Sequence, residues 1–293
     1  MFPPHPTFPD GLAYSVFGFF IGIVSGALGV GGGFAYYPFL NIVAGLPEYA
    51  AAATSTTQIP FTSLSAAITH YYKKNITIPL GLVLIAGSAP GAITAAGIIT
   101  YFGENSINSD RLLPISPELL LNSLYVLIIT LTGLYTIWNA THEFDRLPSG
   151  ALAMLPPEVM PPPSLFRMVA QLKPIRTAVF AYIVGFLSTL LGVGGGTFFV
   201  PYLMFRLNIP PARAIGTSNA VMLFFSLAAV LRYLTAEINP VNLAVVGYLI
   251  VGSVIGSSLG AKMVSQWKGA KTKLIFGIFQ LAVVAIFVLV KFH

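Results

Sequence analysis

The chain has 293 residues, of which 56% are hydrophobic and only 8% charged. A soluble domain carries about 25% charged residues, so this composition excludes a soluble globular protein, and the mean hydropathy of +0.82 agrees. The sequence therefore predicts an all-α polytopic membrane protein, because hydrocarbon accepts a chain only as helices or closed barrels. The absence of cysteine excludes structural disulfides, zinc ribbons and thiol catalysis.

The net charge of +6 raises the question of nucleic acid. The Lys and Arg residues, however, fall in short connections, where positive charge records cytoplasmic orientation. We therefore expect the lipid bilayer as a partner and no nucleic acid. Composition does not indicate the oligomeric state.

Apolar runs succeed one another along the chain and predict ten helical segments. The two shortest, 34–46 and 197–207, have thirteen and eleven residues, which is too few for a crossing of roughly 20. Between the fifth and sixth runs lies a polar, proline-rich break that we expect to be a cytoplasmic linker. The expected organisation is a first membrane repeat over 12–138, this linker over 139–176, and a second membrane repeat over 177–292. The runs are 12–30, 34–46, 50–72, 77–101, 118–138, 177–191, 197–207, 213–236, 241–263 and 272–292.

The two halves repeat one another. A shift of 163 residues aligns 16–66 with 179–229 without a gap, and 20 of those 51 positions are identical, including LGVGGG at 28–33 and 191–196. Further on, a shift of 165 residues aligns GSAPG at 87–91 with GSVIG at 252–256. Such a duplication is typical of many secondary transporters.

Charge indicates that the repeats are inverted. The connection after the third segment carries Lys73 and Lys74 in the first repeat but Glu237 in the second, and the connection after the fourth changes from acidic to a lysine cluster at 262–273. By the positive-inside rule the repeats then face opposite ways. Inversion requires 12–46 and 177–207 to enter and leave on one side, which predicts two re-entrant helical hairpins, each followed by three transmembrane helices. Both termini would lie outside.

The duplicated triple glycines are candidates for an anion site. A nucleotide-binding loop is excluded, because no Lys-Ser/Thr follows, the spacing is not GxGxxG, and both copies lie inside apolar runs. Glycine permits the dihedrals of a reversal, and the helix that begins after it directs N–H groups and a positive dipole end at the loop. Close helix packing is the alternative interpretation. The candidate residues are Gly31, Gly32, Gly33 and Phe34, and Gly194, Gly195, Gly196 and Thr197.

Polar residues at the start of the third segment and of its counterpart complete the predicted substrate-binding set. They are Thr54, Ser55 and Gln58, and Thr217, Ser218 and Asn219. Ser and Thr in membrane helices often bond only their own backbone or a neighbouring helix, so that interpretation stays open. Every Asp and Glu falls in a connection or at a segment end, and His70 is expected at the interface. We therefore expect no enzyme activity, no catalytic residue, no metal site and no cofactor.

The duplicated GxGGG, with a proline five residues after the last glycine and a Thr-Ser near the start of the next helix, resembles the sulfite exporter TauE/SafE family, also called the toluene sulfonate uptake permease family. The resemblance implies a carrier of sulfite, thiosulfate or an organosulfonate across the cytoplasmic membrane, with its site at the midplane between the two GVGGG tips. An anion channel and a carrier of a non-sulfur organic anion remain alternatives. Because no carboxylate is placed for proton relay, we expect export driven by membrane potential.

Overall fold

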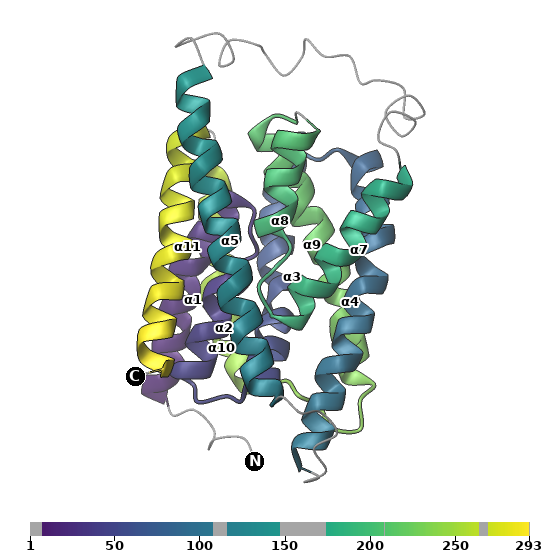
Figure 1. The fold of residues 1–293 in the computed structure, drawn as a ribbon, viewed down its shortest axis with the longest axis vertical. Helices are drawn as coiled ribbons and strands as arrows, with labels where there is room; N and C mark the ends of the chain where they lie inside the picture. The colour runs from purple at the N-terminus through teal and green to yellow at the C-terminus, as the bar shows by residue number, and fades with distance from the viewer. Residues whose placement is uncertain (1–7, 108–115, 147–173, 208, 264–268, 293) are drawn as a thin grey trace.

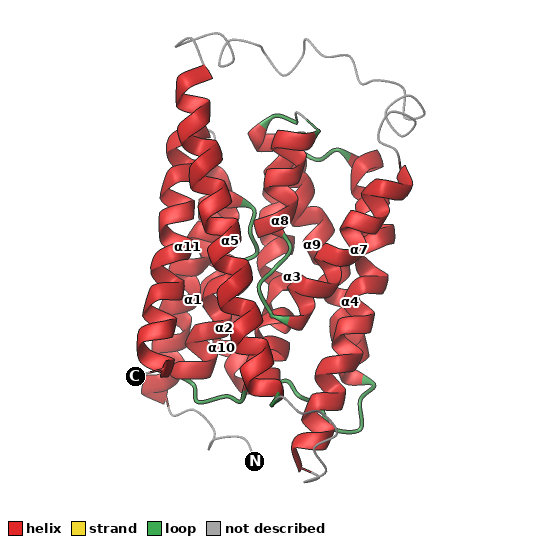
Figure 2. Ribbon diagram, viewed as in Figure 1, coloured by secondary structure: helices red, strands yellow, loops and turns green. Residues whose placement is uncertain are grey.

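The computed structural model describes residues 8–107, 116–146, 174–207, 209–263 and 269–292 (Figure 1). Every regular element in these residues is helical (Figure 2). In chain order the elements are α1 (Phe8–Leu28), α2 (Gly33–Ile42), α3 (Glu48–Tyr72), α4 (Ile78–Ile107), α5 (Pro117–Arg146), α7 (Pro174–Leu190), α8 (Gly196–Pro201), the π-helical turn η1 (Tyr202–Arg206), α9 (Pro211–Leu234), α10 (Leu243–Met263) and α11 (Gly269–Phe292).

Six of the described helices, α1, α4, α5, α9, α10 and α11, are long and apolar enough to cross a membrane. Large apolar side chains on their outer faces are more than half exposed, among them Leu131, Val251 and Ile286. Water would penalise such a surface, whereas hydrocarbon does not. The predicted all-helical polytopic membrane protein is confirmed.

Helices of one half pack along helices of the other. α1 packs along α10, and their repeat equivalents, α7 and α4, pack on each other in the same way. A Cβ at Gly22 would collide with the backbone carbonyl of Ser253, and a Cβ at Gly185 with that of Ser88. Glycine therefore permits backbone contact at equivalent places in both pairs.

The helices α3 and α9 lie together at the centre and run in opposite directions. The backbone N–H of Thr77, just after α3, donates to Thr217 Oγ1 near the start of α9, at 2.9 Å. The backbone N–H of Asn242, in the connection that follows α9, donates to Thr54 Oγ1 near the start of α3, at 3.0 Å. The end of each helix is thus tied to the start of the other.

Two short-limbed hairpins complete the centre. α1 and α2 form one, and α7 forms the other with α8 and η1. In Figure 1, α1 starts at the lower end of the molecule and α7 at the upper end. The ten residues of α2 rise only about 15 Å, half of the roughly 30 Å hydrocarbon core. The returning limb of the first hairpin is therefore too short by itself to cross the hydrocarbon core.

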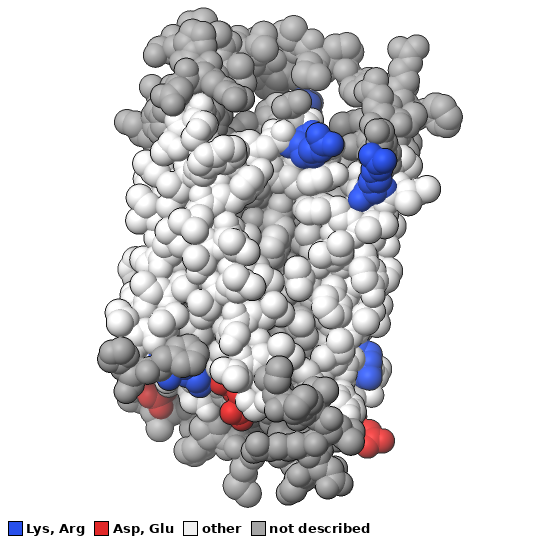
Figure 3. Space-filling view, in the orientation of Figure 1, with Lys and Arg blue, Asp and Glu red and all other residues white. Residues whose placement is uncertain are grey.

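Charge is distributed unequally between the two ends. Among residues with described side chains, Figure 3 shows Lys and Arg at both ends of the visible face but Asp and Glu only at the lower end. Of the Lys and Arg residues whose side chains are described, six lie at helix ends on the upper side of the molecule and two at helix ends on the lower side. These are Lys73, Lys74, Arg176, Arg206, Arg213 and Lys262 above, and Arg232 and Lys291 below.

Candidate functional site

The two glycine tips meet at the centre of the molecule. A Cβ at Gly33, the first residue of α2, would collide with the backbone of Gly192 and Val193. A Cβ at Gly196, the first residue of α8, would collide with the backbone of Gly29 and Val30. Each short helix therefore starts against the tip of the opposite hairpin, and these contacts leave no room for any side chain.

Backbone conformation is a second reason for glycine. Gly31 and its equivalent Gly194 have φ values of 77° and 85°, in the left-handed region that favours glycine. The next pair differs, because Gly32 has φ 72° and Gly195 has φ −71°. The two tips are thus similar in path but not identical in backbone geometry.

The Thr-Ser pairs join the two halves. Ser55 Oγ donates to the carbonyl of Gly192 at 2.5 Å, and Ser218 Oγ donates to that of Gly29 at 3.1 Å. Their neighbours Thr54 and Thr217 accept the backbone N–H groups already described. All four side chains are fully buried. In this structure their hydroxyls hold the tips in place.

Gln58 and Asn219 each keep one polar atom without a partner. Gln58 Oε1 accepts from Thr62 Oγ1 at 2.5 Å, but Gln58 Nε2 is buried with no hydrogen bond. Asn219 Nδ2 donates to the carbonyl of Ile215 at 3.0 Å, but Asn219 Oδ1 has no partner. Buried polar atoms nearly always have a hydrogen-bond partner. Within the predicted set, Gln58 Nε2 and Asn219 Oδ1 are the buried side-chain atoms without one.

Phe34 and Thr197, the second residues of α2 and α8, direct their side chains into the protein. The Phe34 ring packs edge-on against Phe276 and Phe279, and its carbonyl accepts the Tyr125 hydroxyl at 2.5 Å. Thr197 Oγ1 donates to the carbonyl of Gly194 at 3.1 Å. The N-cap residues of α2 and α8 are Gly32 and Gly195, which offer no side-chain hydrogen bond to the helix starts.

Two apolar residues between the tips could not be predicted. The backbone N–H of Gly196 donates to Met222 Sδ at 3.1 Å, and the same sulfur lies 2.8 Å from where a Cβ on Gly31 would be. The repeat equivalent of Met222 is Ile59, which contacts both Gly31 and Gly194. Nothing in the sequence distinguishes this Met and Ile from other apolar residues.

An ion pair between a buried carboxylate and a partly exposed lysine was also not predicted. Glu48 is 5% exposed, and its Oε1 lies 2.9 Å from Lys291 Nζ and accepts from Asn122 Nδ2 at 2.9 Å. Tyr37 OH donates to Asn122 Oδ1 at 2.8 Å. The partners are far apart in sequence, so only the fold brings the start of α3 to the end of α11.

His70 lies in the last turn of α3, and its expected position at the membrane interface stays a prediction. Its side chain is fully buried within the protein and packs beside Gly216 near the start of α9. Neither ring nitrogen has a hydrogen-bond partner. The connection that follows α3 crosses over the start of α9, and this crossing encloses the imidazole.

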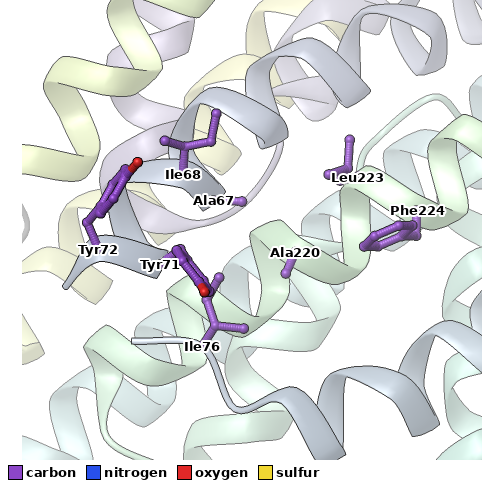
Figure 4. Close-up of a pocket in the computed structure, with 8 residues that line it drawn as sticks. All are labelled: Ala67, Ile68, Tyr71, Tyr72, Ile76, Ala220, Leu223 and Phe224. Carbon is purple, nitrogen blue, oxygen red and sulfur yellow. The ribbon is translucent and has the colours of Figure 1, made fainter. Parts of the chain in front are cut away.

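A groove of about 260 Å³ opens between the end of α3 and the middle of α9 (Figure 4). Its lining is apolar apart from two tyrosine hydroxyls, so it is unsuited to an oxyanion. The lining residues are Ala67, Ile68, Tyr71, Tyr72, Ile76, Ala220, Leu223 and Phe224.

The sulfite exporter TauE/SafE family model matches residues 14–287. The chain belongs to this family. The match covers both glycine tips and confirms the resemblance seen in the sequence. This TauE/SafE chain is therefore a multi-pass membrane transporter and not an enzyme, and its family implies a small anion as substrate.

Curated relatives agree with this assignment. A probable membrane transporter protein of Bacillus subtilis, YunE, is 25% identical over 84% of this chain and 85% of its own length. A probable membrane transporter protein of Xylella fastidiosa is 26% identical over 92% and 91%. Sulfite exporter TauE/SafE family protein 3 of Arabidopsis thaliana is 38% identical, but over only 25% of this chain and 15% of its own. No solved structure matches the chain.

Proposed function

We propose that this TauE/SafE chain exports small sulfur-containing oxyanions, such as sulfite, thiosulfate or an organosulfonate, across the cytoplasmic membrane. The anion binds at the midplane between the two GVGGG tips. One observation carries the proposal: α2 and α8 both start at the centre, each against the glycine tip of the opposite hairpin.

Helix starts provide the positive potential that such a site needs. The first N–H groups of a helix have no partner within the helix, and the dipole places roughly half a positive charge there. Half-helices aimed at a midplane anion recur in secondary transporters. Because glycine lacks a Cβ, the two helix starts can approach the opposite tips closely at the centre. Gln58 Nε2 adds an uncharged donor with no present partner.

The same proposal includes two inverted repeats, 12–138 and 177–292, joined by a cytoplasmic linker over 139–176, with both termini outside. The opposite directions of α3 and α9 support inversion. The excess of described cations at the upper end supports a cytoplasmic upper side. In Figure 1, α1 begins and α11 ends at the lower end.

Cysteine labelling tests this topology directly, because the chain has no native cysteine. We expect Lys74→Cys to react with a membrane-impermeant maleimide only after permeabilisation, and Glu237→Cys to react in intact cells. The two positions follow α3 and α9, so they occupy corresponding places in the two repeats. Labelling of both positions from the same side would contradict inversion.

Membrane potential is sufficient to drive the proposed export. Each negative charge that leaves the cell gains about 2.3 kcal/mol per 100 mV of inside-negative potential. That energy supports a gradient of roughly fifty-fold. Among the described side chains the one buried carboxylate, that of Glu48, lies at the start of α3 and is already paired with Lys291 at the end of α11. Proton coupling is therefore not required.

Proteoliposomes test both the substrate and its coupling. With pH equal on the two sides, an imposed potential should drive labelled thiosulfate towards the positive side. Thiosulfate does not titrate near neutral pH, so flux that follows a pH gradient at zero potential would contradict the proposed coupling. Preloaded unlabelled thiosulfate should accelerate uptake for a carrier and would not do so for a channel. Absence of flux for sulfite, thiosulfate and sulfonates alike would refute the proposed substrate class.

A further inference from the structure

The apolar groove between α3 and α9 opens on the outer surface of the protein. Although the two helices pack together at the centre, side chains that line the groove are exposed on both, among them Ile68 on α3 and Phe224 on α9. Figure 4 shows the small side chains of Ala67 and Ala220 near the middle of the groove, between larger ones. In a bilayer such a groove meets acyl chains and not water.

One end of the groove lies at the level of lipid headgroups. Tyr71 and Tyr72, in the last turn of α3, line this end and are 64% and 81% exposed. Tyrosine is enriched where membrane meets water, because its ring is apolar and its hydroxyl is polar. A Cβ at Gly216 on α9 would collide with the backbone carbonyl of Asn75, so this glycine lies level with the chain just after α3.

The length of the groove fits one leaflet. From Gly216, α9 runs inwards for eight residues to Phe224, the deepest lining residue on this helix. Eight residues of helix rise about 12 Å, which is close to half of the roughly 30 Å hydrocarbon core. An acyl chain that starts at the tyrosines can therefore lie along the groove.

Positive charge lies at the same end, whereas the described carboxylates all lie at the lower end of the molecule. Lys73 Nζ donates to the carbonyls of Ala261 and Lys262 at the end of α10, at 3.0 and 3.3 Å. Lys74 is exposed, and within the described residues no hydrogen bond or ion pair engages its ammonium group. Its φ of 55° lies in the left-handed region, where glycine is the usual residue after a helix. A lysine at this strained position indicates a role for its side chain.

The second repeat provides an internal comparison. When the shift of 163 residues is continued, the end of α3 corresponds to the end of α9 on the lower side. The equivalents of Ala67, Tyr71, Tyr72 and Lys74 are Val230, Leu234, Thr235 and Glu237. The small residue, the interfacial aromatic residues and the positive charge are all replaced there, and the charge is reversed. These features are therefore specific to the upper end and are not a by-product of the duplication.

We propose that the groove binds one anionic phospholipid from the leaflet at the upper end, with an acyl chain over Ala67 and Ala220 and the phosphate beside Lys74 and the tyrosine hydroxyls. In the proposed topology this is the cytoplasmic leaflet, where anionic lipids gather. One lysine near anionic lipid is worth roughly fivefold in binding. The inference does not depend on which anion the chain carries.

A lipid bound here would contact the connection that ties the two central helices together. Ile76 lines the groove, and the next residue, Thr77, donates its backbone N–H to Thr217 Oγ1 at 2.9 Å. A ligand that binds the folded state stabilises it by mass action. Anionic lipid should therefore raise the unfolding temperature of the wild type, and raise that of Lys74→Gln less.

Native mass spectrometry of the purified full chain, titrated with lipid in detergent, tests the inference. The probes are dioleoylphosphatidylglycerol and dioleoylphosphatidylcholine, which share their acyl chains and differ in headgroup charge. We expect the first phosphatidylglycerol to bind about fivefold more tightly than phosphatidylcholine. Lys74→Gln should remove this preference and leave phosphatidylcholine binding unchanged. Ala220→Leu should weaken both lipids, because the larger side chain occupies the groove.

Glu237→Gln is the matched control, because it neutralises the equivalent position of the other repeat. It should leave the preference for phosphatidylglycerol unchanged. If Ala220→Leu does not fold, Tyr72→Ala replaces it, since this exposed side chain lines the mouth of the groove and its loss should also weaken both lipids.

Three outcomes would overturn the inference, and none of them bears on the transport of sulfur anions. The first is equal affinity of the wild type for the two lipids. The second is a gain of phosphatidylglycerol binding in Glu237→Gln as large as the loss in Lys74→Gln, which would show a response to total charge and not to a site. The third is a lipid-free dimer that Ala220→Leu dissociates, which would show that a second copy of the chain fills the groove.

Discussion

Replacing Gly33 or Gly196 by alanine should abolish transport. In each case the new methyl group would collide with the backbone of the opposite tip, and no flexible side chain is present to move aside. Only separation of the two tips relieves such a contact, and separation also disrupts the helix starts that form the proposed site. Overpacking of this kind typically costs about 1 to 3 kcal/mol. We expect transport to fall to background and thermal stability to fall by a few degrees.

Gly247→Ala is the matched control, because it makes the same change in a described helix with nothing within 4 Å of the new Cβ. It should leave both transport and unfolding temperature unchanged. Flux through Gly33→Ala and Gly196→Ala at wild-type rates would show that the tips need not touch. Loss of flux in the Gly247→Ala variant would show that the assay responds to any glycine substitution.

Much of the fold could be predicted because the duplication supplies the same pattern twice. The apolar runs predicted the helices, and in the fifth run the helix continues through Arg146, beyond the expected end at residue 138. The glycine tips were predicted as reversals, and their positive φ values agree. The inverted arrangement remains a prediction, which the antiparallel contacts of α3 and α9 support. The linker lies largely outside the described residues.

The candidate site could be predicted only in part. Gln58 and Asn219 were predicted as site residues from their type, because an amide side chain is costly to bury in an apolar membrane helix. The sequence did not reveal that Ser55 and Ser218 would be engaged by the opposite tip, since that depends on contacts across 137 and 189 residues. Met222 was missed because a thioether that accepts a backbone N–H looks like any core methionine until the tips are assembled.

The ion pair between Glu48 and Lys291 was missed for the same reason, and it carries the second large expected effect. Lys291→Met should destabilise the protein by about 1 to 3 kcal/mol, because the buried Glu48 carboxylate loses a charge-assisted hydrogen bond. Glu48 is 5% exposed and would keep only Asn122 as a partner at its Oε1. The measurement is unfolding of the purified protein in detergent, by heat or by titration with a denaturing detergent.

The double variant Glu48→Gln/Lys291→Met decides between loss of charge compensation and loss of packing. With both charges removed, a neutral amide can still accept from Asn122, so most of the lost stability should return. If the double variant is as unstable as Lys291→Met alone, the lysine contributes through its hydrogen bond to Asn41 Oδ1 or through the packing of its stem, and not through its pairing with Glu48. Tyr37 on α2 donates to the side-chain Oδ1 of Asn122, the residue that also hydrogen-bonds Glu48. We therefore expect Lys291→Met to loosen the returning limb of the first hairpin as well. Faster hydrogen exchange of the backbone amides in residues 33–42 would show this loosening.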